Sequence, residues 1–350
     1  MAYTDIDKSD DYFNTVTYTG NGGTNNITGV NFQPDFVWIK KRDSVVNHRV
    51  YDVVRGVDTN YYKLFPNLSN AENAIQTNEL TSLDSDGFTL ESSTNVNSNG
   101  GSYVSWNWLA GGTGVSNTQG SITSTVSANT TAGFSVVTWT GNGTNGASIG
   151  HGLGTTPSSW IIKQRTGTQA WLVYHPGLSA TDNYLQLSAV NAEATNAPNI
   201  WSADSTTLTF PTSYQGTNGS GSDYVGYFFA EKKGFSKFGS YTGNGSANGP
   251  FVYTGFKPAW FLLKRYDSGS SANWEIYDTT RDTYNQAVKR LAPSLSDAEA
   301  TNFALGDILS NGVKIRQTDQ TWNASGGTYI YMAFAESPFT TSTGIPTTAR

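Results

Sequence analysis

The sequence predicts an all-β protein built from three tandem β-sandwich repeats of about 100 residues each, jelly-roll-like in outline. Two observations carry this prediction: the composition, and a set of landmarks that recurs three times along the chain. Charged residues make up 14% of the 350 residues and aromatic residues 13%, with 37 glycines. Few charges combined with many aromatic and β-branched residues are typical of strands and turns, whereas disorder goes with high charge and few rings.

Six landmarks occur in the same order in three stretches of the chain. The turn sequence Tyr18–Gly22 returns as Trp139–Gly143 and again as Tyr241–Gly245. After each turn come a proline, a lysine six residues later, a strand tyrosine, an Ala-Glu pair and a tyrosine that opens an apolar strand. These later landmarks are Pro34, Pro157 and Pro258; Lys40, Lys163 and Lys264; Tyr51, Tyr174 and Tyr277; Glu72, Glu193 and Glu299; and Tyr103, Tyr224 and Tyr329. Chance does not keep such an order, so the sequence predicts three repeats.

The landmarks also predict the boundaries. We expect an N-terminal arm over 1–12, repeats over 13–112, 134–233 and 234–338, a linker over 113–133 and a C-terminal tail over 339–350. The linker is rich in Gly, Ser, Thr and Asn, but its alternation over 121–126 predicts an extra strand. The tail has too few apolar residues for a core of its own, so we expect it to be disordered or docked on a neighbour.

Local patterns predict individual elements within the repeats. Short β-branched or aromatic runs predict strands over 135–139, 160–163 and 329–334, and turn-then-strand patterns predict hairpins at 86–90 and 311–315. The best helical candidate is 294–303, which follows a serine cap. The loop over 214–223 is expected to be specific to its repeat and to face outwards.

Composition and charge exclude several classes of protein. A net charge of −6 argues against a nucleic-acid partner, which requires a basic face. No apolar run approaches the roughly 18 residues that cross a bilayer, so we expect no membrane insertion. The acidic segment 1–12 does not resemble a signal peptide, which predicts synthesis in a cytoplasm. The absence of cysteine excludes disulfides, thiolate zinc sites and a cysteine nucleophile.

The histidines do not predict a metal site. His48, His151 and His175 lack metal-ligand spacing, so we expect exposed or hydrogen-bonded loop residues. The segment Gly150–Gly154 does not match a phosphate-binding loop, and no GxSxG string is present.

The acidic residues do not predict catalysis. Two pairs, Asp84 with Asp86 and Asp278 with Asp282, flank turns, where Asp caps the local backbone. The same pairs are the candidates for the two acids of a glycoside hydrolase. The glutamates of the Ala-Glu landmark recur in every repeat, which favours a role in the fold.

Two further sets recur with the repeat. The basic clusters at 40–42, 163–165 and 264–265 are interpreted either as solvated strand ends or as a repeated contact with an anion or partner. Trp38, Trp160 and Trp260 lie in apolar runs, which favours core packing over sugar-stacking platforms. The sequence therefore predicts no catalytic, cofactor-binding or metal-binding residues, and no cofactor.

Several segments resemble a known class of protein. They are Met1–Asp7, the Thr-Gly-Asn-Gly turns, Gln33–Arg42, Ile122–Gly143, His151–Arg165 and Ala333–Arg350. Together they resemble the repeat-containing structural proteins of tailed phages that infect marine bacteria, including cyanophages. The resemblance implies a virion component, either tail-fibre-like or head-decorating, made in the bacterial cytoplasm. It carries over no functional residue, and the lack of a coiled-coil or collagen-like shaft favours a compact knob or decoration.

Three functions therefore stand as hypotheses. The first is a non-enzymatic structural protein on the virion surface, anchored to capsid or tail proteins through the arm or the tail segment, as a homo-oligomer or symmetric array. The alternative is a carbohydrate-binding adhesin that attaches to host surface glycan. The third is a polysaccharide depolymerase, for which the sequence offers no convincing pair of acids.

Overall fold

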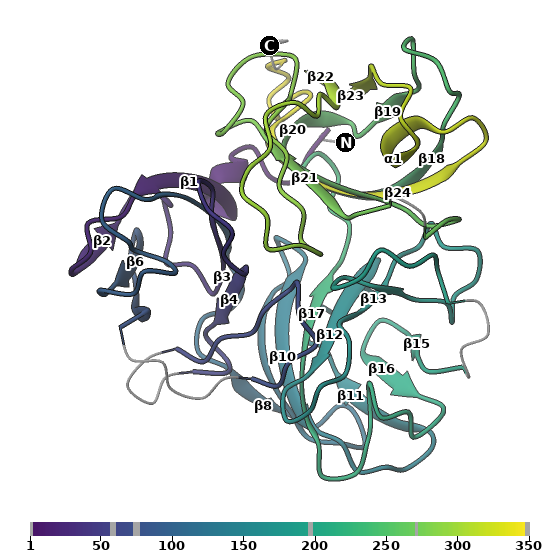
Figure 1. Ribbon diagram of the computed structural model, residues 1–350. Helices are drawn as coiled ribbons and strands as arrows, with labels where there is room; N and C mark the ends of the chain where they lie inside the picture. The colour runs from purple at the N-terminus through teal and green to yellow at the C-terminus, as the bar shows by residue number, and fades with distance from the viewer. Residues whose placement is uncertain (1–2, 57–60, 73–77, 195–198, 270–271, 347–350) are drawn as a thin grey trace.

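The computed structural model describes residues 3–56, 61–72, 78–194, 199–269 and 272–346, and these form an almost entirely β structure. The predicted all-β class is confirmed. We use the predicted boundaries to name unit 1 (13–112), unit 2 (134–233) and unit 3 (234–338). Figure 1 shows the three units as three lobes around a common centre.

Unit 1 consists of a four-stranded and a three-stranded antiparallel sheet. Their strand orders are β1-β7-β3-β4 and β2-β6-β5. The strands are β1 (Phe13–Thr19), β2 (Asn25–Ile27), β3 (Phe36–Lys41), β4 (Arg49–Asp52), β5 (Leu80–Asp84), β6 (Gly87–Leu90) and β7 (Ser102–Trp108).

Unit 2 has the same arrangement, but its larger sheet grows to seven strands. The order is β14-β13-β12-β17-β10-β9-β8, facing a smaller sheet β11-β16-β15. The strands are β8 (Val115–Asn117), β9 (Ser124–Asn129), β10 (Phe134–Thr140), β11 (Ala147–Gly150), β12 (Ser159–Gln164), β13 (Leu172–Tyr174), β14 (Leu185–Gln186), β15 (Ser202–Ala203), β16 (Thr207–Phe210) and β17 (Asp223–Phe229).

Unit 3 repeats the order of unit 1, with sheets β18-β24-β20-β21 and β19-β23-β22. The elements are β18 (Ser236–Thr242), β19 (Phe251–Tyr253), β20 (Phe256–Arg265), β21 (Glu275–Asp278), β22 (Gly306–Leu309), β23 (Gly312–Ile315), helix α1 (Gln320–Asn323) and β24 (Thr328–Pro338). A short 3₁₀ turn, η1 (Ser9–Asp11), precedes unit 1. The closing strand of each unit (β7, β17 or β24) lies in the middle of its larger sheet, between the opening strand and the strand that carries the landmark lysine.

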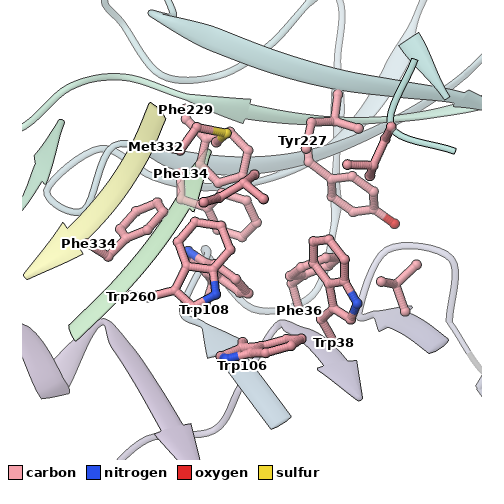
Figure 2. Packing of buried hydrophobic residues seen from close by; sticks show 14 of the residues in the cluster. Phe36, Trp38, Trp106, Trp108, Phe134, Tyr227, Phe229, Trp260, Met332 and Phe334 are labelled. Carbon is pink, nitrogen blue, oxygen red and sulfur yellow. The ribbon is translucent and has the colours of Figure 1, made fainter. Parts of the chain in front are cut away.

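The larger sheets of all three units share one central aromatic core. Side chains alternate along a strand, so β7 points Val104, Trp106 and Trp108 to this centre while Tyr103 packs into the core of unit 1 itself. The corresponding positions of β17 and β24 place Phe229 and Phe334 in the same core, with the Phe334 ring between those of Trp108 and Phe229. Figure 2 shows this contact, in which the Phe334 ring lies 5.6 Å from Trp108 and 6.0 Å from Phe229.

Each unit also has its own core between its larger and smaller sheets. The middle strands of the larger sheets are therefore buried on both faces, as β7, β12 and β17 show by burying almost every residue, polar ones included. Burying one phenylalanine side chain contributes about 1.5–3 kcal/mol, so the aromatic content supplies stability that a chain without disulfides needs.

Most predicted strands form where the sequence places them. The runs 135–139, 160–163 and 329–334 lie within β10, β12 and β24, and the hairpins at 86–90 and 311–315 are β5-β6 and β22-β23. The expected linker is more ordered than predicted, because β8 and β9 within it extend the sheet of unit 2. The extra strand forms over 124–129, three residues beyond the predicted stretch.

The predicted helix over 294–303 is wrong. The segment instead runs without helical hydrogen bonds towards unit 1, where the Glu299 N–H donates to the Arg42 carbonyl at 2.7 Å. Its neighbour Ala300 exchanges backbone hydrogen bonds with Arg290. Contacts with another part of the chain thus override the weak local helix propensity. In the described ranges the α-helix that does form is α1, capped by Asp319, whose side chain accepts from the Thr321 N–H.

The arm and the tail pack together on unit 3. The Tyr3 hydroxyl donates to the Gly255 carbonyl at 2.8 Å, Ile6 enters the central core, and the Ser342 N–H donates to Asp7 at 2.6 Å. The sequence predicts a tail that is either disordered or docked on a neighbour, and residues 339–346 are docked. The remainder of the predicted arm and tail, 1–2 and 347–350, lies outside the described residues.

Candidate functional site

A buried asparagine holds the recurring Thr-Gly-Asn-Gly turn in each unit. In unit 2, Asn218 accepts from the Asn142 N–H at 3.0 Å and donates to the Thr144 carbonyl at 2.9 Å. Asn97 and Asn323 make the corresponding contacts in the other units. Within the loop over 214–223, Asn218 is fully buried and has a counterpart in each unit, so this part of the loop neither faces outwards nor is specific to one repeat, whereas Gln215, Ser220 and Gly221 of the same loop are exposed.

The turn glycines are required by close approach. A Cβ on Gly20 would lie 2.3 Å from the Ser98 carbonyl oxygen, and one on Gly243 would lie 2.2 Å from that of Ala324. Only glycine leaves room for the loop that carries the asparagine.

The joint between units 1 and 2 holds a buried ion cluster around Glu72. The carboxylate accepts from Arg165 of unit 2 at 2.7 Å and from Arg55 of its own unit at 2.9 Å. The Glu72 N–H also donates to the Arg165 carbonyl at 2.7 Å. Arg55 is fully buried and also binds Asp52, so the cluster compensates a buried charge.

The joint between units 3 and 1 repeats this cluster. Glu299 accepts from Arg42 of unit 1 at 2.8 Å and from Arg281 of unit 3 at 3.0 Å. Burial favours a raised pKa for Glu299, but the hydrogen bonds and charges of the two arginines hold that pKa below its ordinary value. The glutamates at these two joints connect the units, in agreement with the role in the fold expected from the sequence.

The joint between units 2 and 3 has the same backbone hydrogen bond as the other two joints, but its glutamate makes no ion pair with the neighbouring unit among the described residues. The Glu193 N–H donates to the carbonyl of Tyr266, the residue two positions after Lys264, where the other units have Arg42 and Arg165. The Glu193 side chain stays within its own unit and accepts from the Ser179 N–H at 3.0 Å. The aspartate and buried arginine of the other joints are replaced here by His175 and Leu178.

At each of the three joints, the residue just before β4, β13 or β21 donates a ring N–H to a backbone carbonyl of the neighbouring unit. The pairs are His48 Nε2 with the Ala292 carbonyl at 3.1 Å, Trp171 Nε1 with the Phe65 carbonyl at 2.8 Å, and Trp274 Nε1 with the Gln186 carbonyl at 2.9 Å. The three joints thus connect unit 1 to unit 2, unit 2 to unit 3, and unit 3 back to unit 1, which closes a ring.

The landmark lysines are buried at the joints. Lys163 donates to the carbonyls of Gln164 and Gly167 at 2.5 and 3.1 Å, and Lys40 and Lys264 bind backbone carbonyls in the same way. Burial lowers the pKa of Lys40 and of Lys163 to about 8 and that of Lys264 to about 7. These lysines face the interior, so they are neither solvated strand ends nor a contact with an anion or partner. Arg42 and Arg165 of the same clusters, in contrast, bind a carboxylate of the neighbouring unit.

The three histidines are all hydrogen-bonded, and none is exposed. In each ring Nδ1 accepts a hydrogen bond, from Trp38 Nε1 in His48 and from backbone N–H groups in His151 and His175, so Nε2 carries the proton and donates to a carbonyl. Burial lowers the pKa of all three, for His175 to about 3. They are neutral structural residues.

The aspartate pairs cap local structure only in part. Asp278 accepts from the Arg281 N–H and Asp282 from those of Val288 and Lys289, as expected. Asp86 instead accepts from the backbone N–H groups of Gly29 and Asn31, 57 and 55 residues away, and so holds a loop of another part of unit 1. Among the described residues, no three His, Asp or Glu side chains form a group that would hold a metal ion. No helix in the described ranges is long and apolar enough to cross a membrane.

The three tryptophans of the apolar runs are core residues but do not occupy equivalent positions. Trp38 and Trp260 stand two and four residues before the landmark lysine, so both point to the central core. Trp160 stands three residues before its lysine, so it points to the core of unit 2. There it lines a surface pocket of about 350 Å³ between β12, β13 and β15. The sequence marks Trp160 but does not show that it borders a pocket.

One family covers most of the chain. A family model described as a domain of unknown function (DUF7483) matches residues 8–338 and so spans all three units. No curated protein and no solved structure matches the chain. The chain therefore belongs to the DUF7483 family.

Proposed function

We propose that this protein is a non-enzymatic structural component of the surface of a phage particle, either a tail-fibre-like knob or a capsid decoration. The observation that supports it best is the closed ring of joints. Each unit contacts both others through a backbone bond of the Ala-Glu landmark, a ring N–H donor and the shared aromatic core.

This construction suits a part that must keep its shape outside a cell. No unit can swing away without breaking two joints and exposing rings such as Trp108 and Phe334, so the body behaves as one rigid piece. It reaches this rigidity without disulfides. The arm and the tail lie side by side on unit 3, which gives partner proteins of the particle one edge at which to bind both segments.

The reason to propose a phage particle is the resemblance of the sequence to phage structural proteins. The test is mass spectrometry of purified particles of the phage that encodes the chain, followed by electron cryomicroscopy. We expect the protein in the particle, with density either on the capsid lattice at high copy number or at the tail in a few copies. Its absence from purified particles would overturn the proposal.

A further inference from the structure

We propose that the pocket of unit 2 binds a neutral sugar residue of a glycan. The pocket lies between β12 and β13 of the larger sheet of unit 2 and β15 of its smaller sheet. Its volume of about 350 Å³ lies within the range of small-ligand sites. This inference rests on the pocket alone and does not depend on the proposed place of the protein in a particle.

One wall of the pocket is aromatic and rigid. The rings of Trp160 and Tyr174 stack with centroids 4.0 Å apart and an angle of 19° between their planes. Trp201 closes the corner edge-on, 5.5 Å from Trp160 and at 85° to it. Trp160 and Trp201 are almost fully buried, whereas Tyr174 is partly exposed. The Tyr174 ring, ordered by its stacking on Trp160, is therefore the aromatic surface that this wall offers to the C–H face of a sugar.

The other wall is polar and uncharged. Thr156, Thr181, Asn199 and Ser202 are exposed and line the opening, so hydroxyl and amide groups stand opposite the rings. None of the described lining residues is Asp, Glu, Lys or Arg. A charged ligand would find no partner there, whereas a neutral polyol would find both donors and acceptors.

Unit 2 differs from its neighbours at the tyrosine of this wall. The equivalent hydroxyls are engaged, Tyr51 donating to Glu79 at 2.7 Å and Tyr277 to the Phe303 carbonyl at 3.0 Å. For Tyr174, burial alone raises the pKa, and no hydrogen bond contributes to the shift.

The indole N–H groups of the wall also lack partners. Trp160 Nε1 and Trp201 Nε1 have no hydrogen-bond partner among the described residues, although both side chains are at least 97% buried. The same holds for the Nε1 atoms of Trp108, Trp260 and Trp322, which lie away from the pocket, and all five atoms are inaccessible to solvent, so the indoles do not point to a ligand. The hydroxyl of Tyr174 is the unused donor that this pocket offers.

The charges that occupy the corresponding region of the other units are missing in unit 2. Unit 1 places Arg49 and Lys63 against Glu79 there, and unit 3 pairs Glu275 with Arg290. Unit 2 has Leu172 and Tyr184 at the positions of Arg49 and Lys63. The pocket is therefore a feature of unit 2 and is not a general property of the fold.

The test measures binding of free sugars to the full chain by saturation-transfer difference NMR. The probes are glucose, galactose, mannose and N-acetylglucosamine, with glucuronate and glucosamine as charged comparisons. We expect transfer to the C–H protons of at least one neutral sugar. Ser202→Trp, at an exposed position, should fill the pocket and abolish the signal. Ser205→Trp, the matched control at an exposed turn that does not line the pocket, should leave the signal unchanged.

Two milder variants test the contacts in case Ser202→Trp unfolds, which thermal unfolding would reveal. Tyr174→Phe and Asn199→Ala should each weaken binding by about fivefold, as expected for the loss of one neutral hydrogen bond. The proposal is overturned if no neutral sugar shows transfer, if only a charged sugar binds, or if binding survives these variants unchanged. Because particle composition is measured separately, failure here leaves the proposed structural function standing, and the reverse also holds.

Discussion

The hydroxyl of Tyr227 in unit 2 donates a hydrogen bond to the carboxylate of Asp52 in unit 1, with 2.8 Å between the two oxygens. Both side chains are buried, and Asp52 also binds Arg55 of its own unit. At the equivalent place between units 3 and 1, Trp106 Nε1 donates to Asp278 at 3.0 Å. A buried carboxylate that reaches across the boundary is therefore a shared device of these two joints.

Replacing Tyr227 with Phe should lower the free energy of unfolding by about 2 kcal/mol, because a buried carboxylate loses one donor. Urea denaturation measures the loss. The matched control is Tyr331→Phe, whose hydroxyl donates to the neutral carbonyl of Tyr253 at 3.0 Å, and which should cost about 1 kcal/mol. Equal losses in the two variants would contradict the special role of the charged acceptor.

Replacing Glu72 with Ala should cost about 3 kcal/mol, because fully buried Arg55 then loses one of its two carboxylate partners. Glu193→Ala removes the corresponding residue of the joint without ions and should cost about 1 kcal/mol, since it removes hydrogen bonds only within unit 2. Thermal or chemical unfolding compares the two variants. A larger loss for Glu193→Ala would show that the ion cluster does not stabilise its joint.

Replacing Asn218 with Ala should cost about 2–3 kcal/mol, because the Asn142 N–H and the Thr144 carbonyl lose their buried partner. Hydrogen exchange should then increase at the turn 140–144 before it increases elsewhere. Asn99→Ala, at an exposed position two residues after the equivalent Asn97, should leave stability within about 0.5 kcal/mol. Unchanged protection of the turn in Asn218→Ala would refute the proposed role.

His175 should make the protein less stable in mild acid. Burial lowers its folded pKa to about 3, so the unfolded chain takes up the proton first, and stability falls as the pH drops from about 6.5 towards 3. Between pH 7 and pH 5 the loss should be about 2 kcal/mol. Burial raises the pKa of Glu275 to about 8, which acts with the opposite sign in this window. The measurement is therefore the difference in pH dependence between the wild type and His175→Gln, and no difference would contradict the prediction.

The buried lysines should make the protein more stable as the pH rises from 8 to 10. Their folded pKa values of about 7 to 8 lie below the ordinary value of 10.5, so the unfolded chain holds its protons to higher pH. Each lysine should add about 1.4 kcal/mol per pH unit in this window. Guanidinium unfolding at pH 8, 9 and 10 measures the slope. Buried tyrosines, whose pKa values are raised by burial, act with the opposite sign as the pH approaches 10. The test is therefore the difference between the wild type and Lys163→Met, which should lower the slope between pH 8 and pH 9 by about 1 kcal/mol per pH unit, and an unchanged slope would rule out neutralisation of Lys163.

The sequence predicted the strands of the apolar runs because short aromatic and β-branched segments between glycines leave few alternatives. It missed the asparagines that hold the turns, although Asn97, Asn218 and Asn323 recur as regularly as the landmarks. Each asparagine stands six residues before the closing tyrosine of its unit, Tyr103, Tyr224 or Tyr329. This constant spacing is the signal that could have identified them. The sequence landmarks also do not show that the register of β4 and β13 aligns His48 with Trp171, two different residue types that donate a ring N–H at their joints.

The sequence by itself determined the all-β class and the recurring landmarks, because both follow from local composition and spacing. The tertiary structure decided what those landmarks do. Whether Lys163 is solvated or buried, and whether Glu72 meets Arg165, depends on how the units pack, and no pattern within one unit encodes its neighbour. The pocket beside Trp160 was decided in the same way, because a shift of one position along the strand turns that ring from the shared centre to the core of unit 2.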